Sequence, residues 1–166
     1  MATHQLFNQM EEAMRVSDAM TAAVRITTPQ QTIAEAAHMM GEIDSGVLPV
    51  GDGDRLVGML TDRDIAIRAV ALGKNPQTPV QEVMSKEVLY CFADEDLDEV
   101  VQKMADRKVR RMPVLNRDKR MVGILSLGDV ALVDDPDITG EALSEISEPG
   151  GQHSQRLKGD GGRFSA

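Results

Sequence analysis

The sequence predicts an α+β fold made of two tandem β-α-β-β-α repeats related by a pseudo-twofold axis. Three observations predict it. The 166 residues suffice for one ordinary domain or two small modules, the chain repeats itself at a fixed offset, and helical and strand periodicities follow the same order in both copies. We expect an N-terminal helix over 1–15, repeats over 16–78 and 79–133, and a largely flexible, mobile acidic C-terminal tail over 134–166.

The repeat is seen in matched residues of the two copies. At an offset of 64, the first-copy residues Val16, Met20, Val24, Met40, Pro49 and Val50 return as Val80, Met84, Val88, Met104, Pro113 and Val114. After one inserted residue the offset is 65, and Val57, Gly58, Leu60 and Asp64 return as Val122, Gly123, Leu125 and Asp129. The insertion falls in a turn, where extra residues are easily absorbed.

Each copy carries the same order of local signals. Apolar spacing of i, i+3, i+4 and i+7 predicts helices over 33–40 and 97–104, the second capped by Asp94 or Asp96. Alternating and β-branched runs predict the strands 24–27, 47–50 and 56–60 in the first copy, and 88–92, 111–115 and 121–125 in the second.

A further helix ends each copy. It begins near Asp62, runs to about Leu72 and stops at Gly73, and its counterpart begins near Gly128. Copies of this size, close to 60 residues, are marginal alone, so we expect them to pack sheet to sheet with two equivalent clefts between them.

The flanking segments show weaker patterns. Leu6, Met10 and Met14 share a helical face, which favours an N-terminal packing helix over a membrane-binding one, because the polar face is not basic. In the tail, the spacing of Ala142, Leu143 and Ile146 indicates one short helix. Residues 150–166 are rich in Gly and Ser and are expected to be mobile.

Composition argues against several classes of protein. A net charge of −9 and only four aromatic residues oppose nucleic-acid binding. No apolar run approaches the roughly 20 residues needed to cross a bilayer, and the first residues lack a secretory signal, so we expect a cytoplasmic protein without membrane insertion. The eleven methionines suit adaptable core packing or a surface that accepts several partners.

Common catalytic and metal-binding patterns are missing from the sequence. Cys91 is read as a small apolar strand residue rather than a nucleophile, and the three histidines have no metal-ligand spacing. The GDGD stretch at 51–54 is better explained as a hairpin turn than as a calcium loop. With no nucleophile–base motif and no P-loop, we expect no catalysis, no metal and no required cofactor.

Two short motifs indicate a family. GMLTDRD at 58–64 and GILSLGD at 123–129 resemble the G-h-x-[S/T]-x-x-D signature of the CBS (cystathionine beta-synthase) domain. With LPV at 48–50 and RMPV at 111–114, the chain resembles a tandem CBS-domain pair, or Bateman module, over roughly 14–133. The resemblance implies regulatory binding of AMP, ADP, ATP, NAD or S-adenosylmethionine between the repeats, for energy or metabolite sensing, and a homodimer.

Each signature contributes a carboxylate, a hydroxyl and a glycine, namely Asp64, Thr61 and Gly58, and Asp129, Ser126 and Gly123. The carboxylates can accept hydrogen bonds from both ribose hydroxyls. The side-chain hydroxyls can bond a phosphate or ribose oxygen beside a helix N-terminus, and the glycines allow close approach of backbone or ligand. The alternative is structural, since such residues are also ordinary helix caps and first-turn acids.

The two copies differ where a phosphate would lie. The second carries Arg110 and Arg111 before Met112, a pattern that in the family supplies arginine to phosphate, whereas the first has glycine and valine there. By the family rule, the cleft of Asp64 receives one of these arginines and the cleft of Asp129 receives none. Arg63 is either a second cation or a solvated helix residue.

The adenine is expected against apolar side chains, for which the candidates by position are Ile26, Leu48, Tyr90 and Met112, although most such residues are core. We therefore expect a non-catalytic sensor that binds an adenosyl ligand and acts on an enzyme or transporter partner. The alternative is a ligand-free module for dimerisation or docking, and an enzyme has the least support.

Overall fold

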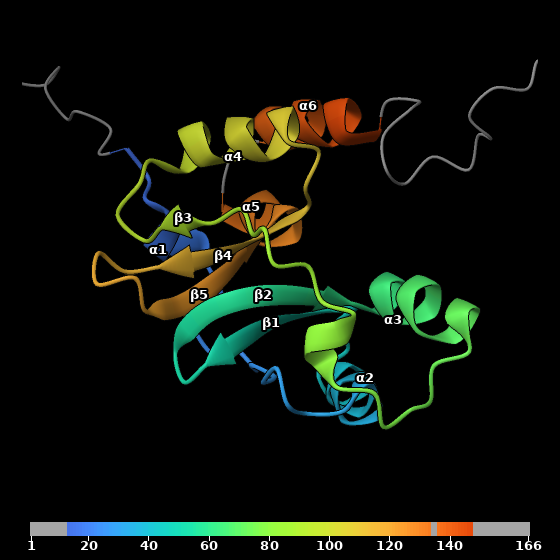
Figure 1. The fold of residues 1–166 in the computed structure, drawn as a ribbon. Coiled ribbons are helices and arrows are strands. Elements are labelled where there is room, and N and C mark those ends of the chain that lie inside the picture. The colour runs from blue at the N-terminus through green and yellow to red at the C-terminus, as the bar shows by residue number, and fades with distance from the viewer. Residues whose placement is uncertain (1–12, 134–135, 148–166) are drawn as a thin grey trace, which may run out of the picture.

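The computed structural model describes residues 13–133 and 136–147, and it has the expected α+β architecture of two repeats. The sheets of the two repeats face each other in the middle of the molecule, with helices on the outside (Figure 1). The hairpin turns also meet, because Met121 N–H donates to Asp54 O at 2.8 Å and the Arg120 guanidinium pairs with the Asp54 carboxylate.

Repeat 1 contains a two-stranded sheet and its helices, α2 (Ile33–Glu42), β1 (Val47–Asp52), β2 (Arg55–Thr61), α3 (Asp62–Arg68) and the 3₁₀ helix η1 (Val70–Leu72). Its core gathers the apolar face of α2 with the buried residues of both strands. Gly73 has a φ of 67°, a left-handed conformation that glycine adopts at low cost, and it ends the helical segment as expected.

Repeat 2 contains a three-stranded sheet and two α-helices, β3 (Cys91–Phe92), α4 (Leu97–Asp106), β4 (Arg111–Leu115), β5 (Met121–Ser126) and α5 (Leu127–Val133), and α6 (Pro136–Ser147) follows it. Asp96 caps α4 by accepting from Glu99 N–H at 3.2 Å. Asp94, the other cap candidate, instead forms an ion pair with Arg117 at 2.8 Å.

The first strand of each repeat is shorter than expected. The strand predicted over 24–27 is wrong, because only Thr27 pairs with β1, through a parallel bridge to Val50. Its counterpart is reduced to the two residues of β3, which run parallel to β4. Both hairpins β1–β2 and β4–β5 are antiparallel, with a register shift at equivalent positions, Val50/Gly51 and Val114/Leu115.

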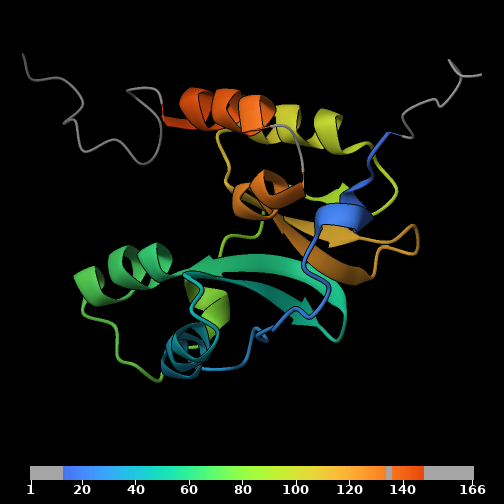
Figure 2. The same ribbon diagram turned by 180° about the vertical axis from the view of Figure 1, so that it is seen from behind.

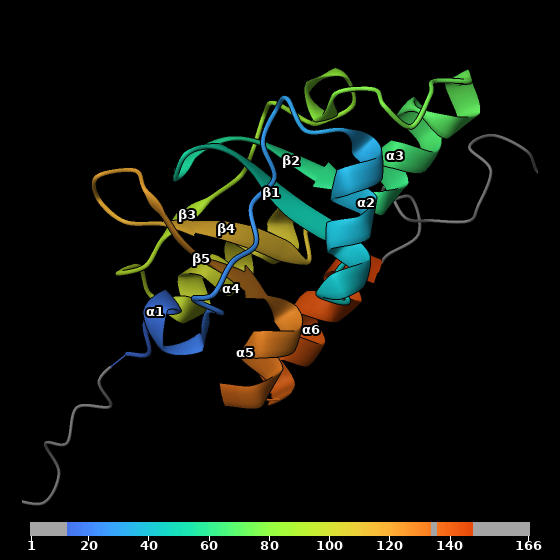
Figure 3. The same ribbon diagram turned by 90° about the horizontal axis from the view of Figure 1, so that it is seen from below.

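The first residues of repeat 1 pack on repeat 2. We call residues 16–21, which contain α1 (Val16–Ala19), the first crossing segment. Val16 is fully buried in the repeat 2 core and donates its N–H to Glu95 O at 3.0 Å. Thr21 pairs with Ile124 of β5 in both directions, at 2.9 and 3.0 Å. Figure 3 shows α1 on the side of repeat 2.

The first residues of repeat 2 make the equivalent exchange with repeat 1. We call residues 80–85, which contain the 3₁₀ helix η2 (Val80–Glu82), the second crossing segment. Val80 donates its N–H to Gln31 O at 2.8 Å, and Ser85 pairs with Met59 of β2 at 2.8 and 2.9 Å. These contacts match those of the first crossing segment residue for residue, as a pseudo-twofold relation requires.

The flanking predictions fall partly outside the described residues. The helix expected over 1–15 lies mostly in 1–12, which the structure does not describe, and residues 13–15 lead into α1. The short helix expected around Ala142 is α6, which lies along α4 (Figure 2) and buries Ala142 and Ile146. Residues 148–166 are also outside the description. None of the described helices has the length and apolar character that a membrane span requires.

Candidate functional site

Asp64 and Thr61 form a reciprocal cap where β2 passes into α3. Thr61 Oγ1 accepts from Asp64 N–H at 3.0 Å, and Asp64 Oδ2 accepts from Thr61 N–H at 2.9 Å. The Asp64 side chain is 15% exposed, and its other oxygen, Oδ1, lies 3.6 Å from Arg68 Nε. The capping interpretation is therefore correct for this copy, and it uses one carboxylate oxygen.

Asp129 and Ser126 repeat this arrangement where β5 passes into α5. Asp129 Oδ2 accepts from Ser126 N–H at 2.9 Å and from Ser126 Oγ at 2.6 Å, while Asp129 N–H donates to Ser126 Oγ at 3.1 Å. Asp129 Oδ1 accepts from Thr21 Oγ1 at 3.4 Å, the outer limit of a hydrogen bond. Both carboxylates thus cap their helix with Oδ2 and present Oδ1 elsewhere.

The signature glycines accommodate the crossing segments. A Cβ at Gly58 would lie 2.8 Å from both Met84 Sδ and Ser85 O, and a Cβ at Gly123 would lie 2.6 Å from Met20 Sδ. Of the two expectations for these glycines, close approach of backbone or of ligand, the structure shows the approach of a neighbouring segment at both positions.

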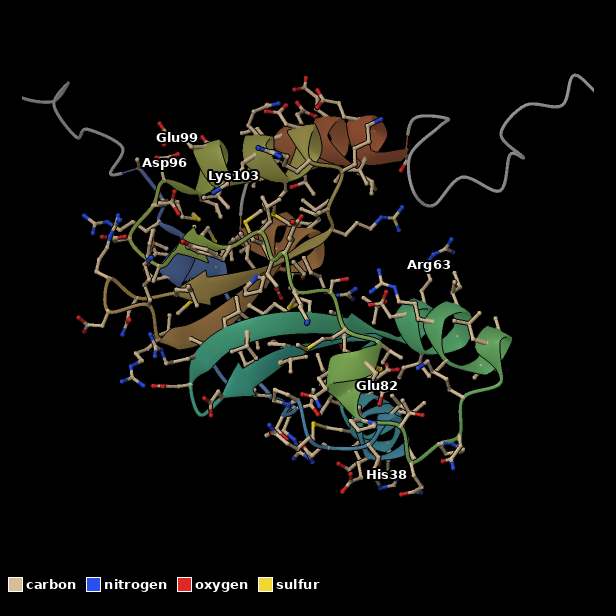
Figure 4. All side chains as sticks on the ribbon, in the orientation of Figure 1. His38, Arg63, Glu82, Asp96, Glu99 and Lys103 are labelled. Carbon is tan, nitrogen blue, oxygen red and sulfur yellow. The ribbon has the colours of Figure 1, made fainter. Side chains whose placement is uncertain are left out.

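Arg110 and Arg111 lie on the surface of repeat 2. Arg111 faces Ser126 across β4 and β5, and Arg110 O accepts from Leu127 N–H at 3.1 Å. Both residues are exposed. Their backbone therefore lies beside the start of α5, and a role of their side chains in the cleft of Asp64 stays a prediction. Arg63 is also exposed, and in Figure 4 its side chain projects from α3 toward the half of the molecule that repeat 2 occupies.

The four adenine candidates divide into two pairs. Leu48 and Met112 are fully buried within the cores of repeat 1 and repeat 2, which favours the core interpretation for them. Ile26 and Tyr90 are half-buried. The Tyr90 ring meets Phe92 edge to face, with centroids 5.6 Å apart, so the accessible aromatic candidate is held in place by a second ring.

Arg117 completes this aromatic cluster. Its guanidinium lies 4.2 Å from the centre of the Phe92 ring, a cation–π contact, and its Nε donates to Asp94 Oδ2 at 2.9 Å. The hydrogen bond from Arg117 lowers the pKa of Asp94, because it stabilises the ionised carboxylate. The cluster therefore carries an exposed ion pair at its edge.

The described residues contain no group of three or more His, Cys, Asp or Glu side chains that could hold a metal ion. His38 is exposed on α2 beside Glu42, at 3.4 Å (Figure 4). Cys91 is buried, and burial, reinforced by nearby Glu95, raises the pKa of its thiol to about 12. A neutral thiol at physiological pH is a poor nucleophile.

Two residues at the site escaped the sequence analysis, Arg68 and Thr21. Arg68 stands four residues after Asp64 on the same helix, a spacing at which opposite charges meet, so the sequence carried a signal for it. Thr21 lies 108 residues from Asp129 and reaches it only through the crossing of the chain. No local pattern indicates such a contact.

Comparison with known proteins gives the family. The model of the CBS domain matches twice, at residues 16–70 and 80–134. The CBS domain-containing protein YhcV of Bacillus subtilis is 43% identical over 133 residues, which are 80% of this chain and 94% of YhcV.

Solved structures agree with this assignment. A structure of Hypoxic Response Protein I with two coordinated zinc ions is 38% identical, with a TM-score of 0.67 over 74% of this chain and 100% of that one. The CBS domain pair of MJ0100, in complex with 5-methylthioadenosine and S-adenosyl-L-methionine, is 28% identical, with a TM-score of 0.65 over 72% and 98%. CBSX2 in complex with AMP is 26% identical, with a TM-score of 0.64 over 71% and 93%. Both the doubled match and these structural likenesses place the chain in the CBS-domain family, as a tandem CBS pair.

Proposed function

We propose that this protein is a non-catalytic regulatory module that binds an adenosine-containing ligand between its two CBS repeats. The observation that carries the proposal is the matched pair of partly buried carboxylates, Asp64 and Asp129. Each has Oδ2 in a helix cap, while its Oδ1 makes only a longer contact, 3.6 Å to Arg68 Nε or 3.4 Å to Thr21 Oγ1. Related CBS pairs hold 5-methylthioadenosine, S-adenosylmethionine or AMP, which share an adenosyl group.

The ribose is the part of the ligand that suits these carboxylates. Its two neighbouring hydroxyls donate, and an ionised carboxylate accepts through both oxygens, whereas an amide would present a donor on one side. Thr61 and Ser126 place a hydroxyl beside each carboxylate. Ile26 and Tyr90, the half-buried candidates, are the proposed apolar contacts of the adenine.

The charge at the rim of each cleft sets the proposed ligand preference. Arg110 and Arg111 are exposed cations, and we assign one of them to the phosphate of a nucleotide bound at Asp64. Arg63 is the proposed second cation there. The cleft of Asp129 lacks this arginine and suits a ligand without phosphate.

Isothermal titration of the full chain with AMP, ATP, NAD and S-adenosylmethionine tests the proposal. We expect saturable binding of at least one of them, weakened at least tenfold when Asp64 and Asp129 are both changed to Asn. Asparagine keeps an acceptor for the helix cap, so the fold is preserved while the ribose acceptor is impaired. Binding of none of the four ligands would overturn the proposal, and steady hydrolysis of a nucleotide, lost in Asp64→Ala, would replace it with an enzyme.

A second candidate function is ligand-free dimerisation or partner docking, and exposed apolar residues favour it. Large apolar side chains emerge at the last helical segments of both repeats, and the exposed fractions are 48% for Ile67, 68% for Val70, 70% for Leu72 and 86% for Leu132. Ile67 and Leu132 are equivalent positions, so a homodimer could use one surface from each repeat. Sedimentation with and without AMP separates the candidates, because a pure docking module would show the same dimer regardless of ligand.

A further inference from the structure

The two signature carboxylates differ in the partner of their second oxygen. Asp64 Oδ1 lies 3.6 Å from the guanidinium of Arg68, one turn further along α3. The equivalent position in α5 is Val133, which carries no charge. Asp129 Oδ1 accepts only the long hydrogen bond from Thr21 among the described residues, and it forms no ion pair with a described lysine or arginine.

The Arg68 side chain is held in place, although it is 46% exposed. Its Nη1 donates to Val83 O at 3.0 Å and to Ser85 Oγ at 3.2 Å, both in the second crossing segment. A guanidinium with these fixed acceptors has already lost much of its conformational freedom, so its contact with Asp64 costs little additional entropy.

The contact with Arg68 affects how well Asp64 can accept hydrogen bonds from a ribose. Thr61 N–H already occupies Oδ2, and a bound ribose needs strong acceptor capacity at Oδ1. The Arg68 guanidinium competes electrostatically for the same lone pairs of Oδ1. A ribose hydroxyl is neutral, so displacing the guanidinium from Oδ1 gives up charge–charge attraction. At Asp129 the competitor is a neutral threonine hydroxyl.

We propose that Arg68 is a specificity-determining residue that weakens ribose binding at Asp64 by competing for its Oδ1, and that Val133 leaves Asp129 free of this competition. The inference rests on the proposed function, since it assumes that the two aspartates bind ribose. The two sites then differ in the partner of the carboxylate Oδ1 as well as in the arginine proposed to bind the phosphate.

The test isolates one carboxylate at a time by AMP titration of the full chain. In an Asp129→Asn background, where Asp64 is the remaining ribose carboxylate, Arg68→Gln tightens AMP binding about two- to fivefold, the range expected for an ion pair of this exposure. Arg68→Lys keeps the charge and stays closer to the parent. Lys74→Gln is the matched control, because Lys74 binds Glu82 of the second crossing segment at 2.8 Å without touching Asp64.

A ligand without ribose hydroxyls distinguishes competition from a general loosening of the fold. For 2′,3′-dideoxy-AMP the gain from Arg68→Gln disappears. Conversely, Val133→Arg in an Asp64→Asn background weakens AMP binding, and Val133 is exposed enough to accept the larger side chain.

The outcomes separate this inference from the proposed function. Unchanged or weaker AMP binding in Arg68→Gln, or an equal gain with the dideoxy ligand or in Lys74→Gln, overturns the competition while the nucleotide-binding function stands. A failure of all four ligands, AMP, ATP, NAD and S-adenosylmethionine, to bind the wild-type chain overturns the two together.

Discussion

At the residue scale, the same side chains serve the fold and the proposed site. Asp64 and Asp129 cap their helices through Oδ2, so the structural and ligand interpretations of these residues are compatible rather than exclusive. The signature pattern predicted the capping partners because they are three residues apart. It could not predict that Leu48 and Met112 are fully buried, since apolar strand residues at a cleft and in a core look alike in sequence.

Cys91 gives a prediction about pH. Its thiol pKa is raised from 9.0 to about 12 because burial disfavours the thiolate. The folded protein therefore retains a proton that the unfolded chain loses, and stability falls as pH rises from about 9 to about 12. Urea unfolding across this window should show a shallower decline in Cys91→Ala. A thiol reagent that modified the native protein rapidly at neutral pH would contradict the buried, protonated thiol.

The signature glycines give a second prediction. Gly123→Ala should destabilise the protein by about 1–3 kcal/mol, because the added Cβ meets Met20 Sδ and Thr21 O, the latter at 2.9 Å. Gly41→Ala is the control, since nothing lies within 4 Å of its Cβ position and alanine favours the helix by about 0.5–1 kcal/mol. Thermal unfolding compares the two variants, and equal melting temperatures would refute the close approach at Gly123.

At the scale of the elements, the sequence predicted those that have strong periodicity. The strand over 111–115 is reproduced with the same bounds as β4, and the helix over 97–104 lies within α4. The strand over 24–27 was wrong, because a local β-pattern does not guarantee that the chain runs beside a partner strand for its full length. Only Thr27 does so.

The helix α6 gives an element-scale prediction. Ile146 is 4% exposed in the repeat 2 core, so Ile146→Ala should cost about 2–5 kcal/mol of unfolding free energy. Leu143→Ala on the same helix should change it by no more than about 0.5 kcal/mol, because Leu143 is 45% exposed. Urea titration measures both. Similar values for the two variants would mean that α6 does not pack on repeat 2.

At the scale of the whole molecule, the repeats are joined by an exchange of their leading segments. Val16 belongs to the core of repeat 2 and Val80 to that of repeat 1. The matched offset predicted two equivalent units and their pseudo-twofold relation, because identical local signals specify similar folds. It could not predict the exchange, since packing a segment on its own repeat or on the other satisfies the same sequence pattern. Thr21 reaches Asp129 only through this exchange, and the exchange also brings Ser85 to the Arg68 guanidinium.

The paired aspartates are proposed to hold the ribose of an adenosyl ligand between the repeats. A crystal structure of the full chain grown with AMP tests it most directly. We predict AMP between the repeats, with ribose hydroxyl oxygens about 2.6–3.2 Å from a carboxylate oxygen of Asp64 or Asp129. AMP bound elsewhere on the molecule, with both carboxylates engaged only in their helix caps, would contradict it.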